Sequence, residues 1–289
     1  MQLIVGASGA VGIPTVRHLV QLGQDLRALS SSEASAERLR ALGVGEVVVG
    51  SYRDDGEIER AMRGVDAVCY IPARFVEDEF KVGKATVDAA RDAGVDHFLF
   101  CSAFQPQLQG LGHHWQKLLL EEHLVESDLR ATVVQPSMFM QNLRVEWPVI
   151  MATGEYRRPY STGSKMSVID TDDLGEAMAK IMTDSCLQGA TYQLAGDGPL
   201  SHAEMAEIVS EEIGKPVLAI KRDINDWRVW ATERGWTDYA IENYMHMCDH
   251  YDKHGYKYAN AFTLGAVLGR QPLSYREFIR KFAAEQSTK

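Results

Sequence analysis

The chain has 289 residues, of which 45% are apolar and 24% are charged, and its formal net charge at pH 7 is −10. This length and composition are typical of a globular protein with a large core, and they argue against intrinsic disorder. An acidic chain without a run of lysines or arginines is not expected to bind nucleic acid, and its first apolar run is too short for a signal peptide or a membrane span.

Three closely spaced glycines follow the first apolar run. Residues 3–5 are Leu, Ile and Val, then come Gly6, Gly9 and Gly12, and a helical pattern continues to Gly23. This order predicts a strand, a glycine turn and a helix whose first N–H groups face an anion such as a diphosphate. The spacing is GxxGxxG rather than GxGxxG, and such a run can also form an ordinary turn. Its position between a strand and a helix favours a dinucleotide site.

The second predicted strand, residues 25–29, runs into Ser30, Ser31 and Ser32. In dinucleotide-binding folds, an acidic residue here binds the adenosine ribose, whereas a basic residue accepts the 2′-phosphate of NADP. Three hydroxyls without a carboxylate favour NADP(H) over NAD(H). The alternative is that Ser31 and Ser32 cap the helix that follows.

Further strands are expected at 46–49, 66–71, 97–103 and 131–135, with helices between them. This alternation predicts an α/β fold with a doubly wound parallel sheet, in which ligands bind beyond the carboxyl ends of the strands. Strands near 168–170 and 191–195 are expected to return to that sheet. We therefore predict an NAD(P)-binding Rossmann domain over 1–150 and a smaller, mostly helical substrate-binding lobe over 151–289.

Lys117 lies on a helix predicted for residues 113–126, with apolar residues on both sides. A half-buried lysine can have a lowered pKa and can supply a proton or a charge where a substrate oxygen becomes negative. His113 and His114 precede it and could relay a proton, because histidine titrates near neutrality. The alternatives are an ordinary ion pair between Lys117 and Glu121, one turn further on, and histidines at the protein surface.

The aromatic side chains of Phe104, Phe139, Tyr160, Trp227 and Tyr251 suit a flat apolar substrate. The alternative is that these residues belong to the hydrophobic core.

Other chemistries are less well supported. The segment 246–254 reads HxCDHxxxH in part, which matches neither a zinc ribbon nor HExxH, so no metal site is expected. The four cysteines form no CxxC pair, which indicates reduced thiols in a cytoplasmic protein, and no GxSxG motif indicates a serine hydrolase.

Several segments together resemble the NmrA-like branch of the atypical short-chain dehydrogenase/reductases. They are GASGAVG at 6–12, HHWQK at 113–117, QPSMFMQN at 135–142, VIDTDDLGEAM at 168–178, HYDKHGY at 250–256 and LGRQPLSYREFIRKF at 268–282. The resemblance implies a Rossmann domain, a small C-terminal lobe and a substrate cleft between them. It also implies that Lys117 binds the nicotinamide ribose.

From these patterns and the resemblance, we expect the following site residues. The catalytic residues are Lys117 and His113. The cofactor-binding residues are Gly6, Ser8, Gly9, Ala10, Val11, Gly12, Ser30, Ser31, Ser32, Pro72, Ala73, Ser102, Lys117, Pro136, Ser137 and Phe139. The substrate-binding residues are Phe104, His114, Phe139, Asn142, Tyr160, Trp227 and Tyr251.

Three functions remain open. The first is an NAD(P)H-dependent reductase of a small aromatic or conjugated carbonyl or quinone-type compound, for which a homodimer is the candidate assembly. The second is a non-catalytic NADP(H) redox sensor that binds a protein partner, and the third is an isomerase or lyase that uses Lys117 as a base.

Two differences between this sequence and the family it resembles favour the sensor. His113 replaces the tyrosine of the larger superfamily, and Ser31 replaces the arginine that the NmrA-like reductases usually have after the second strand.

Overall fold

The computed structural model describes residues 1–54 and 56–287. The chain divides into two compact units. We call Met1–Pro136 with Thr171–Gln193 the N-terminal unit, and Ser137–Asp170 with Leu194–Lys289 the C-terminal unit. The chain first passes between them after residue 136, earlier than the boundary expected at 150.

The N-terminal unit is built on a seven-stranded parallel sheet, which confirms the predicted fold class. Its strand order is β10-β6-β5-β4-β1-β2-β3. The strands are β1 (Gln2–Val5), β2 (Leu26–Ser30), β3 (Glu46–Val49), β4 (Ala67–Tyr70), β5 (His97–Cys101), β6 (Ala131–Pro136) and β10 (Thr191–Leu194). The chain grows outward from β1 to β3 on one side and from β4 to β6 on the other, so the topological switch point lies between β1 and β4.

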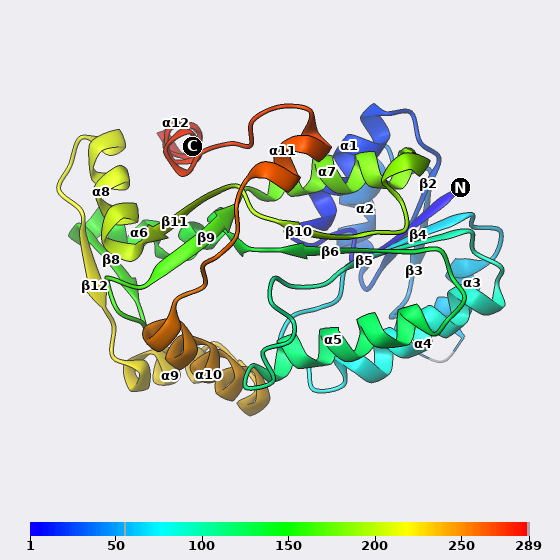
Figure 1. Ribbon diagram of the computed structural model, residues 1–289, viewed down its shortest axis with the longest axis horizontal. Helices are drawn as coiled ribbons and strands as arrows, with labels where there is room; N and C mark the ends of the chain where they lie inside the picture. The colour runs from blue at the N-terminus through cyan, green and yellow to red at the C-terminus, as the bar shows by residue number, and fades with distance from the viewer. Residues whose placement is uncertain (55, 288–289) are drawn as a thin grey trace. The chain divides into compact units, whose positions relative to one another are not determined.

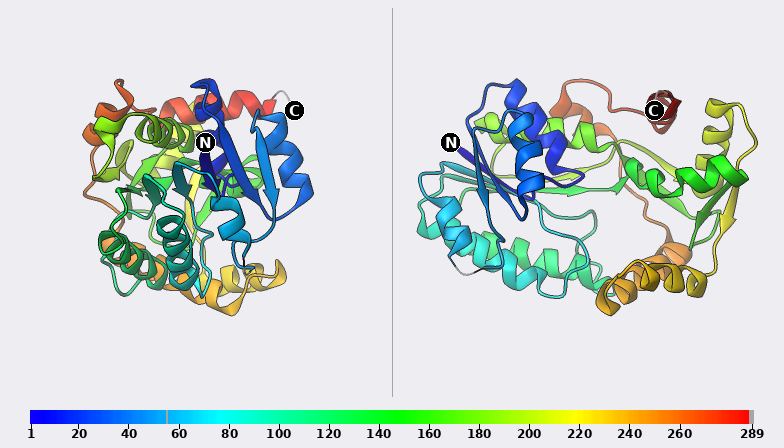
Figure 2. Two further views of the ribbon diagram at one scale, coloured as in Figure 1. Left: turned by 90° about the vertical axis from the view of Figure 1, so that its right-hand side faces the viewer. Right: turned by 180° about the vertical axis from the view of Figure 1, so that it is seen from behind.

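Helices cover both faces of this sheet, and the inner strands β1, β4 and β5 consist mainly of buried apolar residues, whereas the edge strand β3 is only partly buried. Figure 1 shows α1 (Gly12–Gln21) and α7 (Thr171–Thr183) on one face, and α4 (Glu79–Asp92) and α5 (Gly112–Val125) on the other. Two further helices are α2 (Glu33–Ala41) and α3 (Glu57–Met62), and η2 (Ser185–Leu187) is a 3-10 turn. Figure 2 shows the two helix layers from other sides. A Cβ at Gly175 would lie 2.6 Å from Pro14 Cβ, so a glycine is needed where α7 meets α1.

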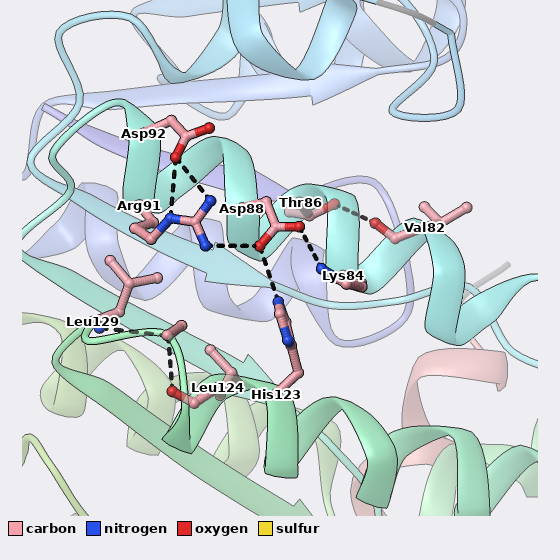
Figure 3. Close-up of polar contacts among 10 residues, drawn as sticks. Val82, Lys84, Thr86, Asp88, Arg91, Asp92, His123, Leu124 and Leu129 are labelled. Carbon is pink, nitrogen blue, oxygen red and sulfur yellow. Dashed lines mark hydrogen bonds and ion pairs between the residues drawn. The ribbon is translucent and has the colours of Figure 1, made fainter.

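The contact between α4 and α5 combines an apolar seam with a polar rim. A Cβ at Gly83 would lie 2.5 Å from Leu120 Cδ2, so the helices approach closely there. At the rim, the Asp88 carboxylate pairs with Lys84 Nζ at 2.7 Å and with His123 Nε2 at 3.0 Å (Figure 3). Asp88 thereby connects its own helix to α5.

The C-terminal unit contains two small sheets and most of the remaining helices. A three-stranded sheet has the order β11-β9-β7, and β12 pairs in parallel with β8. The elements are β7 (Met138–Phe139), η1 (Met140–Asn142), α6 (Leu143–Thr153), β8 (Glu155–Arg158), β9 (Lys165–Ile169), β11 (Asp197–Ser201), α8 (His202–Ile213), β12 (Leu218–Lys221), α9 (Ile224–Glu233), α10 (Asp238–His254), α11 (Phe262–Leu268) and α12 (Tyr275–Ser287).

One expectation about the strands is wrong. The strand near 168–170 does not return to the central sheet, because β9 pairs instead with β11 and β7. Its hydrogen-bonding edges are occupied by these two strands. The strand near 191–195 is β10, which does join the central sheet, beside β6. Among the described residues, no helix is long and apolar enough to cross a membrane.

Candidate functional site

The glycine turn after β1 packs against the end of β4. Gly6 has a φ of +83°, and a Cβ there would lie 2.2 Å from the carbonyl oxygen of Ile71. Gly9 donates its N–H to the Gly6 carbonyl at 3.1 Å, and a Cβ at Gly12 would lie 2.2 Å from that same oxygen. A side chain at Gly6 would be strained by the positive φ and would meet the Ile71 carbonyl, and a side chain at Gly12 would meet the Gly6 carbonyl. Both Gly6 and Gly12 are therefore required to be glycine.

The start of α1 is open to an anion. Val11 occupies the N-cap position without a side-chain hydrogen bond, and the first turn contains no acidic residue. Gly9 and Ala10 are exposed at the turn, and Ser8 is half-buried. A helix start whose N–H groups lack a side-chain cap carries a partial positive charge that suits a phosphate. These residues therefore fit the diphosphate of a dinucleotide.

Other residues expected at the cofactor follow neighbouring strand ends. Ile71 donates its N–H to the Val5 carbonyl at 3.0 Å, which joins the ends of β4 and β1, and Ser102 donates to the Val134 carbonyl at 2.8 Å, which joins β5 to β6. The residues that follow these ends include the half-buried Pro72, the exposed Ala73 and the buried Pro136. The strand ends of the N-terminal unit thus share the edge of the sheet where ligands bind in this fold class.

The three serines after β2 differ in their surroundings. Ser32 is the N-cap of α2 and accepts a hydrogen bond from the Ser35 N–H at 3.3 Å, so the capping alternative is correct for this residue. The buried Ser30 donates its hydroxyl to the Ser32 carbonyl at 3.1 Å. Ser31 is exposed. Of the three hydroxyls, that of Ser31 remains best placed to meet a ligand.

Lys117 is buried on α5, but its partner is not Glu121. Its Nζ donates to the Glu79 carboxylate in the first turn of α4, and the two side chains are 8% and 2% exposed. Burial raises the pKa of Glu79, and the Lys117 charge partly opposes that shift. Sequence reasoning missed Glu79. An acidic residue at the start of a predicted helix is usually explained by the helix dipole, so its sequence context alone does not mark it as a partner.

Glu121 binds the ends of β5 and β6 instead. It accepts hydrogen bonds from the Ser102 hydroxyl at 2.5 Å and from the Gln135 amide at 2.9 and 3.0 Å. Burial raises the pKa of Glu121, while the Ser102 and Gln135 bonds lower it. The Lys117 charge also acts on the thiol of Cys101, the last residue of β5. Lys117 therefore lies near a strand end at the ligand edge of the sheet.

His113 does not titrate near neutrality, contrary to the prediction. Burial lowers its pKa to about 2, with further lowering by His114 and Lys117. Its ring lies 4.5 Å from those of both Phe75 and His114, and its Nδ1 has no hydrogen-bond partner. His114 is also buried, with Nδ1 3.3 Å from the Gln105 carbonyl. Neither histidine is at the surface, and His113 is neutral at pH 7.

Most residues expected to bind substrate are packed in the interior. Trp227 stacks on Tyr244 at a centroid distance of 4.0 Å within an aromatic cluster of α9 and α10. Tyr160 and Tyr251 are buried with rings 5.9 Å apart. Phe104 is 1% exposed in the N-terminal unit. These four aromatic side chains are therefore part of the hydrophobic core, as the alternative interpretation of the sequence had it.

The remaining expected residues lie around β7 and η1 in the C-terminal unit. Phe139 and Asn142 are half-buried. Ser137 is buried, and its hydroxyl makes no hydrogen bond, whereas its N–H donates to the Leu194 carbonyl at 2.9 Å. Of the residues expected at the site in this unit, these three keep a partly exposed side chain or an unused polar atom.

Comparisons with known proteins agree with this architecture. A family model described as the NmrA-like family matches residues 2–265. The NAD(P)H azoreductase of Xenophilus azovorans is 29% identical over 291 aligned residues, which cover 98% of this chain and 98% of that protein. An NADPH-dependent quinone oxidoreductase of Escherichia coli, solved with NADPH, superposes with a TM-score of 0.86 at 21% identity and covers 98% of this chain and 100% of that chain. NmrA, a negative transcriptional regulator solved with NADP, superposes with a TM-score of 0.81 at 18% identity and covers 99% of this chain and 97% of that chain.

Proposed function

The chain belongs to the NmrA-like family, and from this premise we propose that it is an NAD(P)H-dependent reductase of a small aromatic or conjugated carbonyl or quinone-type compound. The observation that carries the proposal is the glycine turn, which leaves an uncapped helix start without an acidic side chain. Relatives named for the reduction of azo compounds and quinones support the same class of substrate.

In this proposal, the N–H groups of Ala10 and Val11 hold the cofactor diphosphate, while Gly9 lets the backbone approach it closely, and Pro72 and Ala73 follow the adjacent strand end. A bound dihydronicotinamide supplies the hydride. Lys117 contributes a fixed positive charge near the substrate oxygen that becomes negative, and Glu79 holds its ammonium in place. Because His113 is neutral at pH 7, we assign it no role as a proton donor.

The first experiment measures the reduction of a panel of quinones, azo compounds and enones with NADPH. We expect Lys117→Met to lower kcat/KM by about a hundredfold, the usual effect of losing one stabilising group at a developing negative charge. Lys84→Met is the matched control, since Lys84 pairs with Asp88 at the protein surface. Wild-type activity in Lys117→Met would remove this residue from the mechanism, and inactivity of the wild-type protein on every compound would argue against a reductase.

We also propose that the cofactor is NADP(H) rather than NAD(H). Residues 30–32 present no carboxylate to repel a 2′-phosphate, and the Ser31 side chain is exposed. Calorimetry should therefore give a lower Kd for NADPH than for NADH. Ser31→Asp should weaken NADPH binding by about tenfold, the equivalent of one repulsive charge contact, and leave NADH binding intact. Equal affinities of the wild-type protein for the two cofactors would contradict the preference.

A second candidate is a redox sensor without catalytic activity. It is favoured by the pairing of Lys117 with Glu79 and by the neutral state of His113, which together leave no titrating acid among the expected catalytic residues. NmrA, described as a negative transcriptional regulator, has the same fold. A sensor should bind NADPH and NADP⁺ with clearly different affinities and turn over none of the panel, whereas a reductase should show turnover.

A further inference from the structure

Arg158 is a buried cation in the C-terminal unit that has no anionic partner. It is the last residue of β8 and only 8% exposed. No carboxylate of the described residues lies within 4.0 Å of its guanidinium, whereas other arginines, such as Arg27 and Arg157, form ion pairs. Its Nε makes no hydrogen bond, and its Nη2 reaches only the Tyr156 hydroxyl, at 3.4 Å. A buried charge without a partner is unfavourable, so this arrangement needs an explanation.

The guanidinium is surrounded by phenol groups. Its Cζ lies 5.4 Å from the centre of the Tyr156 ring. The Arg158 charge also acts on Tyr160 and Tyr244, which come from the segment after β8 and from α10. Burial keeps both phenols protonated by raising their pKa values. The shell around Arg158 therefore consists of neutral hydroxyls and aromatic rings.

A second buried group without hydrogen bonds lies beside this shell. His202, the first residue of α8, packs edge-on against Tyr156 at a centroid distance of 4.7 Å. Neither of its ring nitrogens makes a hydrogen bond within 3.5 Å, although the Tyr156 backbone is close enough to affect its titration. Burial, with a smaller effect from Arg158, lowers the pKa of His202 to about 3, so the ring is neutral at pH 7. It can offer one N–H to an acceptor.

The acidic residue that interacts electrostatically with Arg158 is Glu146 on α6. The two interact electrostatically, but they form no ion pair within 4.0 Å. Burial raises the pKa of Glu146, and Arg158, Arg222 and Arg157 lower it. Glu146 thus interacts with three arginines, and Arg158 has only the long hydrogen bond to the Tyr156 hydroxyl, with its Nε left without an acceptor.

We propose that Arg158, Tyr156, Tyr160 and His202 form a binding site in the C-terminal unit for a small organic carboxylate. The guanidinium presents a planar pair of donors, the geometry that binds a carboxylate through two parallel hydrogen bonds. The tyrosine rings favour an aryl group attached to that carboxylate. Arg158 keeps 8% of its surface exposed, the largest exposed fraction of these four residues. This site is independent of the proposed reductase activity, because binding there requires neither a nucleotide nor turnover.

The test measures benzoate binding to the whole protein, without nucleotide and at low ionic strength, by calorimetry and by thermal shift. Acetate, sulfate and chloride are run in parallel to separate an aryl carboxylate from other anions. Arg158→Lys retains a charge but loses the planar pair of donors, and Arg158→Met loses both. Arg157→Gln is the matched control, because Arg157 is the preceding residue of the same strand and pairs with Glu155 at 2.5 Å.

We expect saturable benzoate binding to the wild-type protein and to Arg157→Gln. Binding to Arg158→Lys should be weaker by at least about tenfold, the contribution of one charge-assisted hydrogen bond. If Arg158→Met does not fold, the comparison of Arg158→Lys with Arg157→Gln still decides. The proposal is overturned if benzoate does not bind the wild-type protein, if it binds Arg158→Lys equally well, or if only sulfate or chloride binds.

Discussion

Replacing Glu79 with glutamine leaves the Lys117 ammonium buried without an opposite charge. Both side chains lie between α4 and α5, and each is at most 8% exposed. Glu79 Oε2 makes no hydrogen bond, so Lys117 is the group that satisfies this carboxylate. The perturbation therefore removes the counter-charge of a desolvated cation.

Breaking a buried ion pair by removing one partner costs about 3–5 kcal/mol, because the remaining charge stays desolvated. We expect Glu79→Gln and Lys117→Met each to lower the free energy of unfolding by about 3 kcal/mol. The double variant should lose less than the sum of the two, since neither charge is then left alone. In contrast, Lys84→Met removes an exposed pair on the same helix and should cost at most about 0.5 kcal/mol.

Urea titrations followed by circular dichroism give these free energies for the four variants and the wild-type protein. The double-mutant cycle yields the coupling between Glu79 and Lys117 directly. Single-variant losses below about 1 kcal/mol, or a coupling near zero, would contradict a buried, mutually dependent pair. Such a result would also remove the basis for assigning Glu79 a role in positioning Lys117.

Three further predictions follow from the N-terminal unit. Gly6→Ala should destabilise the protein more than Gly23→Ala, because both glycines have positive φ but only the Cβ at Gly6 meets a backbone oxygen. The midpoints of urea unfolding compare the two variants, and an equal loss of stability in both would contradict the close packing at Gly6. Burial alone would raise the pKa of Asp88, but its bonds to Lys84 and His123 outweigh burial and lower it. Its stabilising contribution is therefore present above about pH 4 and lost as the pH falls through the lowered pKa, and Asp88→Asn should flatten that part of the stability curve. Finally, NMR titration of the His113 ring should show it neutral down to pH 4, since its pKa is about 2, and a protonated ring at pH 6 would refute its burial.

The order of strands and helices in the N-terminal unit could be predicted from the sequence because it depends on local patterns. Short apolar runs separated by helical periods mark a parallel sheet buried on both faces. The strand predicted at 46–49 is β3, and the glycines after residue 5 form the expected turn. The helix cap at Ser32 could also be predicted from the sequence, because an N-cap side chain bonds to a backbone N–H only two or three residues further on.

Contacts between distant segments were decided by tertiary structure alone. Lys117 has an acidic residue one turn away on its own helix, yet it pairs with Glu79, which is 38 positions earlier in the chain. The local pattern could not show that packing turns Glu121 toward Ser102 and Gln135, nor that it buries Arg158 among tyrosines without a carboxylate. Periodicity determines which residues share a face of a helix or strand, whereas the partners and burial of a charged group depend on which faces the folded chain brings together.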